Sequence, residues 1–246
     1  MGKRVTCALN QPIAKSGAPV YFEALGSERD GAFAQYCCVS ADQLFDVSES
    51  PLTDIEIGAM PCAYGTALNL LTRSQVNDGD RVLVTGASGG VGLATVQLAR
   101  QKGARVTAIA SAPKADAVLA AGAQSVLDRD ASLPKEGFTV VIDVVGGNQF
   151  GEFLDALCPG GRLATSGAIA GPMAEVDLRT LYLKDLTVFG CTYQSREVFR
   201  ALVSLINTGS IRPLVSKVYP LKEIAQAQTD FMAKRYPGKL VLRPFF

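Results

Sequence analysis

The chain has 246 residues, of which 48% are hydrophobic and 19% charged, and its net charge is +1. This composition is typical of a soluble globular protein, and the near-neutral charge gives no indication of a nucleic-acid partner. The sequence holds no histidine, which removes the commonest general acid/base and the commonest zinc ligand together. The first residues lack the apolar core of a secretory leader and no stretch is long enough to span a bilayer, so we expect a cytoplasmic protein without a membrane partner.

The first 52 residues predict a small β-rich unit. Apolar runs of strand type at 5–9, 20–22 and 33–39 are separated by Gly, Pro and Asp clusters. From Thr53 the pattern changes, because T-D-I-E is a capping-box signature and the residues up to Arg73 are too continuously apolar for a surface helix. We therefore expect a buried helical segment after the β-rich unit.

The stretch 81–100, RVLVTGASGGVGLATVQLAR, predicts a strand at 81–85, a glycine turn at 86–92 and a helix in direct succession. The first turn of a helix leaves backbone N–H groups unpaired, so this order can cradle a phosphate. Gly89 would let a pyrophosphate come close and Gly92 would let the helix pack tightly on the strand, whereas Ala87 replaces the first glycine of the dinucleotide pattern G-x-G-x-x-G. By itself the motif also fits a glycine-rich turn in an unrelated α/β protein.

The next predicted strand, 105–110, indicates which dinucleotide is bound. Ser111 directly follows it, 22 residues after Gly89, where an NAD-binding protein usually has an Asp or Glu for the ribose hydroxyls. Ser111 can donate a hydrogen bond to a 2′-phosphate, and Lys114 can balance its charge. The pattern favours NADP(H), and the alternative is that Lys114 is a solvated residue of the next helix.

Strands and helices continue to alternate, and six strands separated by helices predict an α/β fold with a doubly wound parallel sheet whose ligand sites lie at the carboxyl ends of the strands. The further strands of this region are expected at 125–127, 138–144, 162–166 after a turn at 159–161, and 186–189. The helices are expected at 113–121, from Phe150 to Leu157, and at 195–208. A tail with a strand at 214–219, a helix at 221–234 and a strand at 239–242 should rejoin the first unit.

These elements predict two domains. Residues 1–52 and 212–246 would form the β-rich domain, and residues 53–211 a linking helix with the dinucleotide-binding domain. The last strand, 186–189, would be an apolar edge of the sheet, which makes a homodimer plausible.

The six cysteines include no C-x-x-C pair, and we expect most of them to be small core residues: Cys7, Cys37, Cys38, Cys62, Cys158 and Cys191.

Several segments together resemble the medium-chain dehydrogenase/reductase superfamily, in its quinone oxidoreductase and zinc-type alcohol dehydrogenase-like branches. They occur in the family's order and span nearly the whole chain. They are DGAFAQYCCV (30–39), PCAYGTAL (61–68), the 81–100 stretch, AAGA (120–123), VVIDVVGG (140–147), the PGGRLATSG turn and strand, and GKLVLRP (238–244).

The resemblance implies a Rossmann domain beside a partial β-rich, GroES-like domain, with NADPH lying across the strand ends. The pyrophosphate would lie on Ser88, Gly89, Gly90 and Val91, with Gly92 in the helix behind them. The adenosine phosphate would lie near Ser111, Lys114 and Arg129, although Arg129 could also be a solvated loop residue. The nicotinamide would lie between Val144 and Val145, the backbone of Ser166, Gly167 and Ala168, and the backbone of Phe189, Gly190 and Cys191, with Thr66 close to the ring.

The sequence departs from the family at its start. Full-length relatives begin with further strands that supply much of the substrate cleft and the catalytic Cys and His zinc ligands, and this chain starts after them. Cys62 stands where zinc-dependent relatives have another metal ligand, but one thiolate without partners cannot hold zinc, so we expect no metal and a packed small residue instead.

The expected function is that of an NADP(H)-dependent, zinc-independent oxidoreductase that passes a hydride to a small-molecule quinone, enone or carbonyl compound. Tyr64 is a candidate proton donor if its ring faces the cleft, but a core aromatic is the commoner role for such a residue. A non-catalytic NADPH-binding protein is the alternative. A short-chain dehydrogenase is excluded because no tyrosine has the Tyr-x-x-x-Lys spacing that its proton transfer needs.

Overall fold

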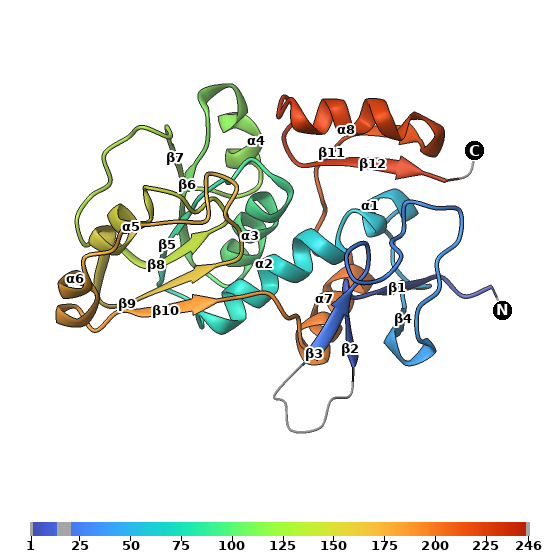
Figure 1. Ribbon diagram of the computed structural model, residues 1–246, viewed down its shortest axis with the longest axis horizontal. Coiled ribbons are helices and arrows are strands. Elements are labelled where there is room, and N and C mark those ends of the chain that lie inside the picture. The colour runs from blue at the N-terminus through green and yellow to red at the C-terminus, as the bar shows by residue number, and fades with distance from the viewer. Residues whose placement is uncertain (1, 14–20, 245–246) are drawn as a thin grey trace. The chain divides into compact units, whose positions relative to one another are not determined.

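Six parallel strands form the largest sheet in the part of the chain that the computed structural model describes, residues 2–13 and 21–244 (Figure 1). Along the chain they are β5 (Arg81–Val84), β6 (Arg105–Ile109), β7 (Ser125–Leu127), β8 (Phe138–Asp143), β9 (Leu157–Thr165) and β10 (Thr187–Gly190). Their spatial order is β10-β9-β8-β5-β6-β7. The direction of winding reverses between β5 and β8, which is the doubly wound order that the sequence predicts.

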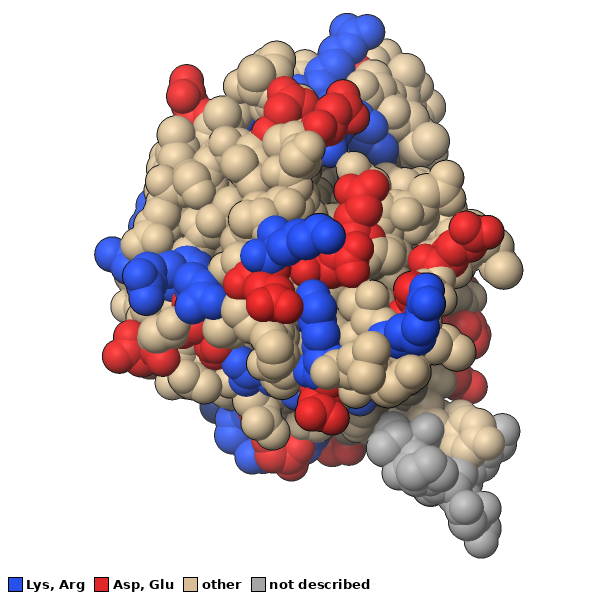
Figure 2. Space-filling view, turned by 90° about the vertical axis from the view of Figure 1, so that its left-hand side faces the viewer, with Lys and Arg blue, Asp and Glu red and all other residues tan. Residues whose placement is uncertain are grey.

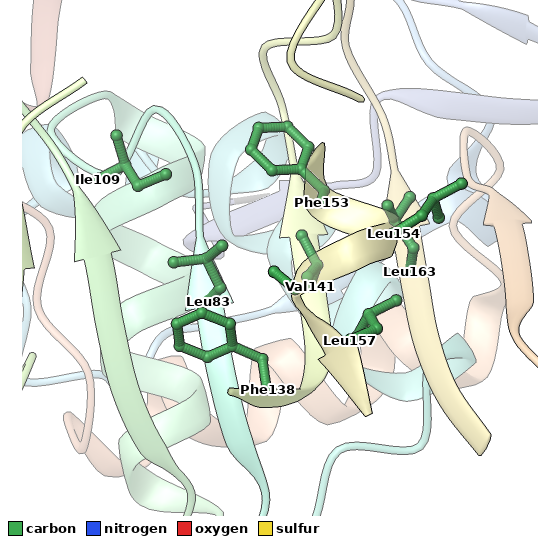
Figure 3. Close-up of a cluster of buried hydrophobic side chains, with 9 residues drawn as sticks. Leu83, Ile109, Phe138, Val141, Phe153, Leu154, Leu157 and Leu163 are labelled. Carbon is green, nitrogen blue, oxygen red and sulfur yellow. The ribbon is translucent and has the colours of Figure 1, made fainter. Parts of the chain in front are cut away.

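Both faces of this sheet are buried. Leu83, Val141 and Leu163 point to one face, where they pack with Phe153 and Leu154 of helix α5 (Phe150–Ala156) (Figure 3). The residues that alternate with them in the strands, such as those next to Leu83, are buried as well. A strand covered on both sides must be apolar at successive positions, which is why these strands are continuous apolar runs in the sequence.

Five of the six predicted strands agree with the observed bounds to within one residue at each end. The exception is β9, which includes the residues expected to form a turn at 159–161. Phe138 pairs with Leu157 and Val140 with Arg162, so residues 158–161 form a bulge in a continuing strand. The predicted turn is therefore wrong, because a glycine pair inside a strand accommodates a bulge as readily as it ends the strand.

Helices α2 (Pro61–Arg73), α3 (Gly90–Gln101) and α4 (Ala115–Ala120), the last preceded by the 3-10 turn η2 (Ala112–Lys114), follow the predicted segments. Helix α6 (Leu178–Leu183) was not predicted. It is six residues long and none of its side chains is buried, with Leu178, Tyr182 and Leu183 exposed, so it is too short for a periodic apolar pattern to identify it in the sequence.

The chain divides into two units, Met1–Gly65 with Tyr193–Phe246, and Thr66–Thr192, and the six-stranded sheet lies in the second. The described residues of the first unit form three two-stranded sheets. They are β1 (Val5–Cys7) with β4 (Leu44–Asp46), β2 (Asn10–Ile13) with β3 (Tyr21–Ala24), and β11 (Val215–Pro220) with β12 (Lys239–Arg243). Its helical elements are η1 (Ala41–Gln43), α1 (Asp54–Gly58), α7 (Arg196–Thr208), η3 (Leu221–Glu223) and α8 (Ile224–Met232).

Contacts within this first unit connect residues that are far apart in the sequence. The Ser50 hydroxyl donates to the carbonyl of Ile206 in α7 at 2.7 Å, and the rings of Phe45 and Phe199 lie 5.2 Å apart. The predicted capping box of α1 is present, with Thr53 and Glu56 each accepting from the other's backbone N–H. Residues 53–65 and 193–211 thus belong to the same compact unit as the β-rich segments.

The predicted strand at 33–39 is wrong. Residues 31–40 form bends and irregular backbone, and the side chains of Phe33 and Tyr36 are 69% and 82% exposed. An apolar run forms a strand only when a neighbouring strand and a core surface are available to it. Of the run predicted at 20–22, Val20 lies outside the described residues and β3 begins at Tyr21.

The burial of the cysteines also differs from the prediction. Only Cys191 is buried, Cys7 and Cys158 are half-buried, and the others, Cys62 among them, are exposed. Cys62 is therefore not a packed core residue. It lies at the start of α2 on the side of the helix that faces solvent, a property that the one-dimensional pattern of an apolar helix does not reveal.

Charges of both signs are interspersed over the face of the molecule seen in Figure 2, in agreement with the net charge of +1. Within the described ranges, none of the helices combines the length and the apolar composition that a membrane crossing requires.

Candidate functional site

The loop between β5 and α3 has the geometry of a phosphate cradle. Gly89 is the N-cap residue of α3, is exposed, and has extended backbone. A Cβ atom built on it would have only the Gly86 carbonyl oxygen nearby, at 3.4 Å, so the space above it is open. The N–H groups of Gly90, Val91 and Gly92 in the first turn lie beside this space, where a helix attracts anions.

Ser111, Lys114 and Arg129 lie at the ends of the next two strands. The backbone N–H of Lys114 donates to the Ser111 carbonyl at 2.9 Å, so both residues belong to one turn after β6. Ile109 of β6 pairs with Leu127 of β7, and Ser111 and Arg129 each follow two residues after these partners. The sheet register therefore brings Arg129, which is exposed, to the same edge as Ser111 and Lys114.

The loops that follow β8 and β9 are in close contact. The backbone N–H of Ser166 donates to the Asp143 carbonyl at 3.1 Å, and that of Ala170 donates to the Val145 carbonyl at 2.9 Å. A Cβ atom on Gly167 would lie 2.7 Å from the Val144 carbonyl oxygen, so only glycine allows this approach. Four residues expected at the nicotinamide, Val144, Val145, Ser166 and Gly167, are thus brought together.

A cavity of about 590 Å³ opens beside these loops. It is lined mainly by small and apolar residues, which include Gly146, Phe150, Ala168, Pro172, Met173 and Val176. Its position at the ends of β8 and β9 is where an open α/β sheet binds its ligands.

Arg73, which the sequence analysis did not single out, supports the end of β10. Its guanidinium carbon lies 5.8 Å from the centre of the Phe189 ring, and its Nη1 donates to the Gly190 carbonyl. Burial raises the pKa of the Cys191 thiol, although the Arg73 guanidinium acts in the opposite direction. The third group of residues expected at the nicotinamide is therefore held from α2.

Asp143, the last residue of β8, is a second residue that sequence reasoning missed. Its side chain is fully buried and accepts hydrogen bonds from Thr85, Val145, Gly146 and Thr165. The sequence could have indicated this residue, because a single Asp stands within the apolar run FTVVIDV and buried carboxylates are rare without a specific role.

The two candidate residues of the helical segment lie in different units. Tyr64 belongs to the first unit, is 2% exposed, and donates its hydroxyl to the Arg212 carbonyl at 3.0 Å. Thr66 is half-buried and begins the second unit, which contains all of the residues expected to contact the cofactor. The hydrogen bond of Tyr64 favours its structural role over that of a proton donor.

The residues present do not fit a zinc site. The sequence has no histidine, and within the described ranges no three Cys, Asp or Glu side chains come together in a group that could hold a metal ion. Cys62 therefore has no partners for metal binding in the part of the chain that is described.

Most of the chain is similar in sequence to known oxidoreductases. Residues 90–208 match a family model described as zinc-binding dehydrogenase. An acryloyl-coenzyme A reductase of Metallosphaera sedula is 33% identical over 87% of this chain, and a quinone oxidoreductase of Sus scrofa is 31% identical over 88% of it. The alignments cover 66% and 70% of those two proteins, so this chain spans about two thirds of their length.

The structural comparison gives a similar result. The crystal structure of a protein described as an alcohol dehydrogenase from Sinorhizobium meliloti superimposes on the whole chain with a TM-score of 0.91 and 43% sequence identity. The match covers 70% of that protein's chain.

Proposed function

Since the chain belongs to the zinc-binding dehydrogenase family of the medium-chain dehydrogenase/reductase superfamily, we propose that it is an oxidoreductase that transfers a hydride between a nicotinamide cofactor and a small organic molecule. The observation that carries the proposal is the common location of the expected cofactor residues. Those of the first five strands follow the carboxyl ends of β5 to β9, and Phe189, Gly190 and Cys191 lie at the end of β10, all within one unit. A bound nicotinamide would supply the hydride, and the protein would hold and orient it.

We propose NADP(H) rather than NAD(H) as the cofactor. No carboxylate occupies the position of Ser111, and Lys114 lies in the same turn, with the cationic Arg129 at the adjacent strand end. These groups favour a 2′-phosphate by hydrogen bonding and charge, whereas an Asp or Glu at this point would repel it.

We propose that the acceptor carries an alkene conjugated with a carbonyl group. Quinones and acryloyl thioesters, which are named in the descriptions of two relatives, share this feature. It falls within the quinone, enone and carbonyl classes expected from the sequence. Hydride addition to such an alkene needs orientation and a proton, and it can proceed without a metal ion to polarise the carbonyl group.

In this mechanism the chain acts mainly by orientation. Backbone groups of residues 166–168 and 189–191 would hold the carboxamide of the ring so that one face meets the acceptor. The small side chains around Gly146 and Ala168 would leave room for the acceptor in the adjacent cavity. The proton would come from water, because Tyr64 is occupied by its hydrogen bond to Arg212.

The test is a titration of the purified chain with NADPH and with NADH, followed by turnover. Turnover is measured as the loss of NADPH absorbance with quinones, enones, enoyl thioesters and aldehydes. Tight NADPH binding with reduction of the conjugated acceptors supports the proposal. Binding without turnover would favour a non-catalytic NADPH-binding protein, and absence of binding would contradict both.

We also propose a homodimer in which β10 pairs with its copy. β10 is an edge strand of the sheet, and its Val188 side chain is 42% exposed. An apolar edge strand with unpaired backbone groups favours such pairing. A cytoplasmic location stays a prediction from the sequence.

A further inference from the structure

A buried carboxylate lies at the centre of the candidate site. Asp143 ends β8, and its side chain has no exposed surface. The Thr85 hydroxyl donates to its Oδ1 at 2.7 Å and the Val145 backbone N–H donates to the same oxygen at 3.0 Å. The Gly146 N–H lies 3.1 Å from Oδ2, and the Thr165 hydroxyl lies 3.3 Å from that oxygen.

These donors come from three neighbouring strands. Thr85 directly follows β5, Val145 and Gly146 belong to the loop after β8, and Thr165 ends β9. The Thr85 hydroxyl also accepts from the backbone N–H of Val144 at 3.0 Å. One carboxylate thus connects the carboxyl ends of β5, β8 and β9, and β5 and β8 flank the point where the winding of the sheet reverses.

The loops that these bonds hold are in contact with one another. A Cβ atom on Gly86, which begins the turn toward the phosphate cradle, would lie 2.9 Å from the Val145 side chain and 3.1 Å from that of Val144. Gly86 has a positive φ of 55°, which suits glycine. If Val144 and Val145 shifted toward Gly86, they would therefore push against the turn that leads to Gly89.

Asp143 forms no ion pair with a lysine or arginine of the described residues, so hydrogen bonds alone compensate its burial. A buried carboxylate is costly unless all its acceptor sites are used, and hydrogen bonds to a charged acceptor are stronger than those to a neutral one. An apolar residue would fill this place in the sheet without connecting the loops.

We infer that Asp143 is a positioning residue for the cofactor, an inference that depends on the proposed function. It holds the loop after β8 against the end of β9 and against the turn after β5. In this arrangement the backbone around the nicotinamide and the phosphate cradle keep a single relative position. Removing the carboxylate would loosen both parts of the site at once.

The test compares NADPH binding by the wild-type chain, Asp143→Asn and Asp80→Asn. Asp80 is the matched control, because it is another buried carboxylate of the sheet, hydrogen bonded to Thr139 at 2.7 Å and Arg162 at 2.6 Å, but lies at the opposite end of β5. The dissociation constant is measured from NADPH fluorescence, and the melting temperature of each variant is recorded.

Asp143→Asn is expected to raise the dissociation constant for NADPH about tenfold. Its NH₂ group would replace one carboxylate oxygen, so an N–H or O–H donor that this oxygen accepts from would lose its acceptor. Asp80→Asn is expected to lower the melting temperature and leave the dissociation constant within about twofold of wild type. A purely structural role for Asp143 would lower the melting temperature and leave NADPH binding unchanged.

Thr85→Val and Thr85→Ser keep the test valid if Asp143→Asn does not fold. Thr85→Val removes the hydroxyl that joins β5 to Asp143, and Thr85→Ser retains it. We expect weaker NADPH binding in the first and recovery in the second. Unchanged binding in folded Thr85→Val and Asp143→Asn, or equal weakening in Asp80→Asn, would overturn the inference. Failure of the wild-type chain to bind NADPH or NADH would instead overturn the proposed function and the inference with it.

Discussion

The Cα atom of Gly92 lies so close to the carbonyl oxygen of Gly86 that a Cβ atom built on it would be 2.3 Å away. This added Cβ atom would also lie 2.5 Å from the Cα atom of Ala87. Both neighbours are backbone, which cannot rotate away. We expect Gly92→Ala to destabilise the protein by roughly 1–3 kcal/mol through overpacking, measured by urea denaturation.

Gly89→Ala is the matched variant for the same loop. Its Cβ atom would meet only the Gly86 oxygen at 3.4 Å, which is an ordinary contact, so the stability should change little. If a pyrophosphate approaches this surface, the added methyl group should weaken NADPH binding severalfold. Equal stability losses in the two variants, or unchanged binding in Gly89→Ala, would contradict this assignment of roles.

Lys114→Glu should weaken the binding of NADPH much more than that of NADH. Replacing a cation by an anion beside Ser111 would repel the 2′-phosphate that only NADPH carries. The difference between the two dissociation constants is the measurement. Lys102→Glu is the control, since Lys102 caps the opposite end of α3. Equal effects of Lys114→Glu on both cofactors would remove Lys114 from the phosphate site.

Tyr64→Phe should lower the free energy of unfolding by about 1 kcal/mol while turnover stays near the wild-type value. The variant removes the hydrogen bond to the Arg212 carbonyl but retains the buried ring. Denaturation and steady-state kinetics are measured on the same preparation. A large fall in turnover without a loss of stability would restore Tyr64 as a proton donor.

Glu56→Gln should reduce stability at neutral pH and have a smaller effect in acid. The backbone hydrogen bond from Thr53, followed by the Thr53 side chain and the charge of Arg212, holds the pKa of Glu56 below its usual value of 4.5, although partial burial opposes this. A lowered pKa in the folded state contributes stability above the unfolded pKa and loses it as the pH falls through the folded one. The difference in unfolding free energy between the variant and the wild type should therefore shrink below about pH 4.5. A difference that is constant over this range would show that the charge of Glu56 has no part in the cap.

Val188→Lys should convert a dimer into monomers if β10 pairs with its copy. A charge on an edge strand opposes the approach of a second edge. Light scattering after size exclusion measures the mass, and Leu119→Lys, on an exposed position of α4, is the control. A wild-type chain that is already monomeric at micromolar concentration would contradict the proposed dimer.

The sequence by itself determined the parallel sheet and the strand, glycine turn and helix that we propose as a phosphate cradle. Local rules suffice for both, because buried strands are continuous apolar runs, and a strand, a glycine turn and a helix in succession present free N–H groups to an anion. The alternation of strands and helices then places Ser88, Ser111 and Val144 after the carboxyl ends of the neighbouring strands β5, β6 and β8. The capping box at Thr53 was also readable, since it involves residues only three positions apart.

Only the tertiary structure decided how that edge is held together. Asp143 joins Thr85 and Thr165, which lie 58 and 22 positions from it in the sequence, and Arg73 reaches Gly190 over 117 positions. The exposure of Cys62 and the irregular backbone at 33–39 likewise depend on which surfaces the fold leaves uncovered. Local propensity carries no information about such long-range partners, because their contacts exist only after distant strands have paired.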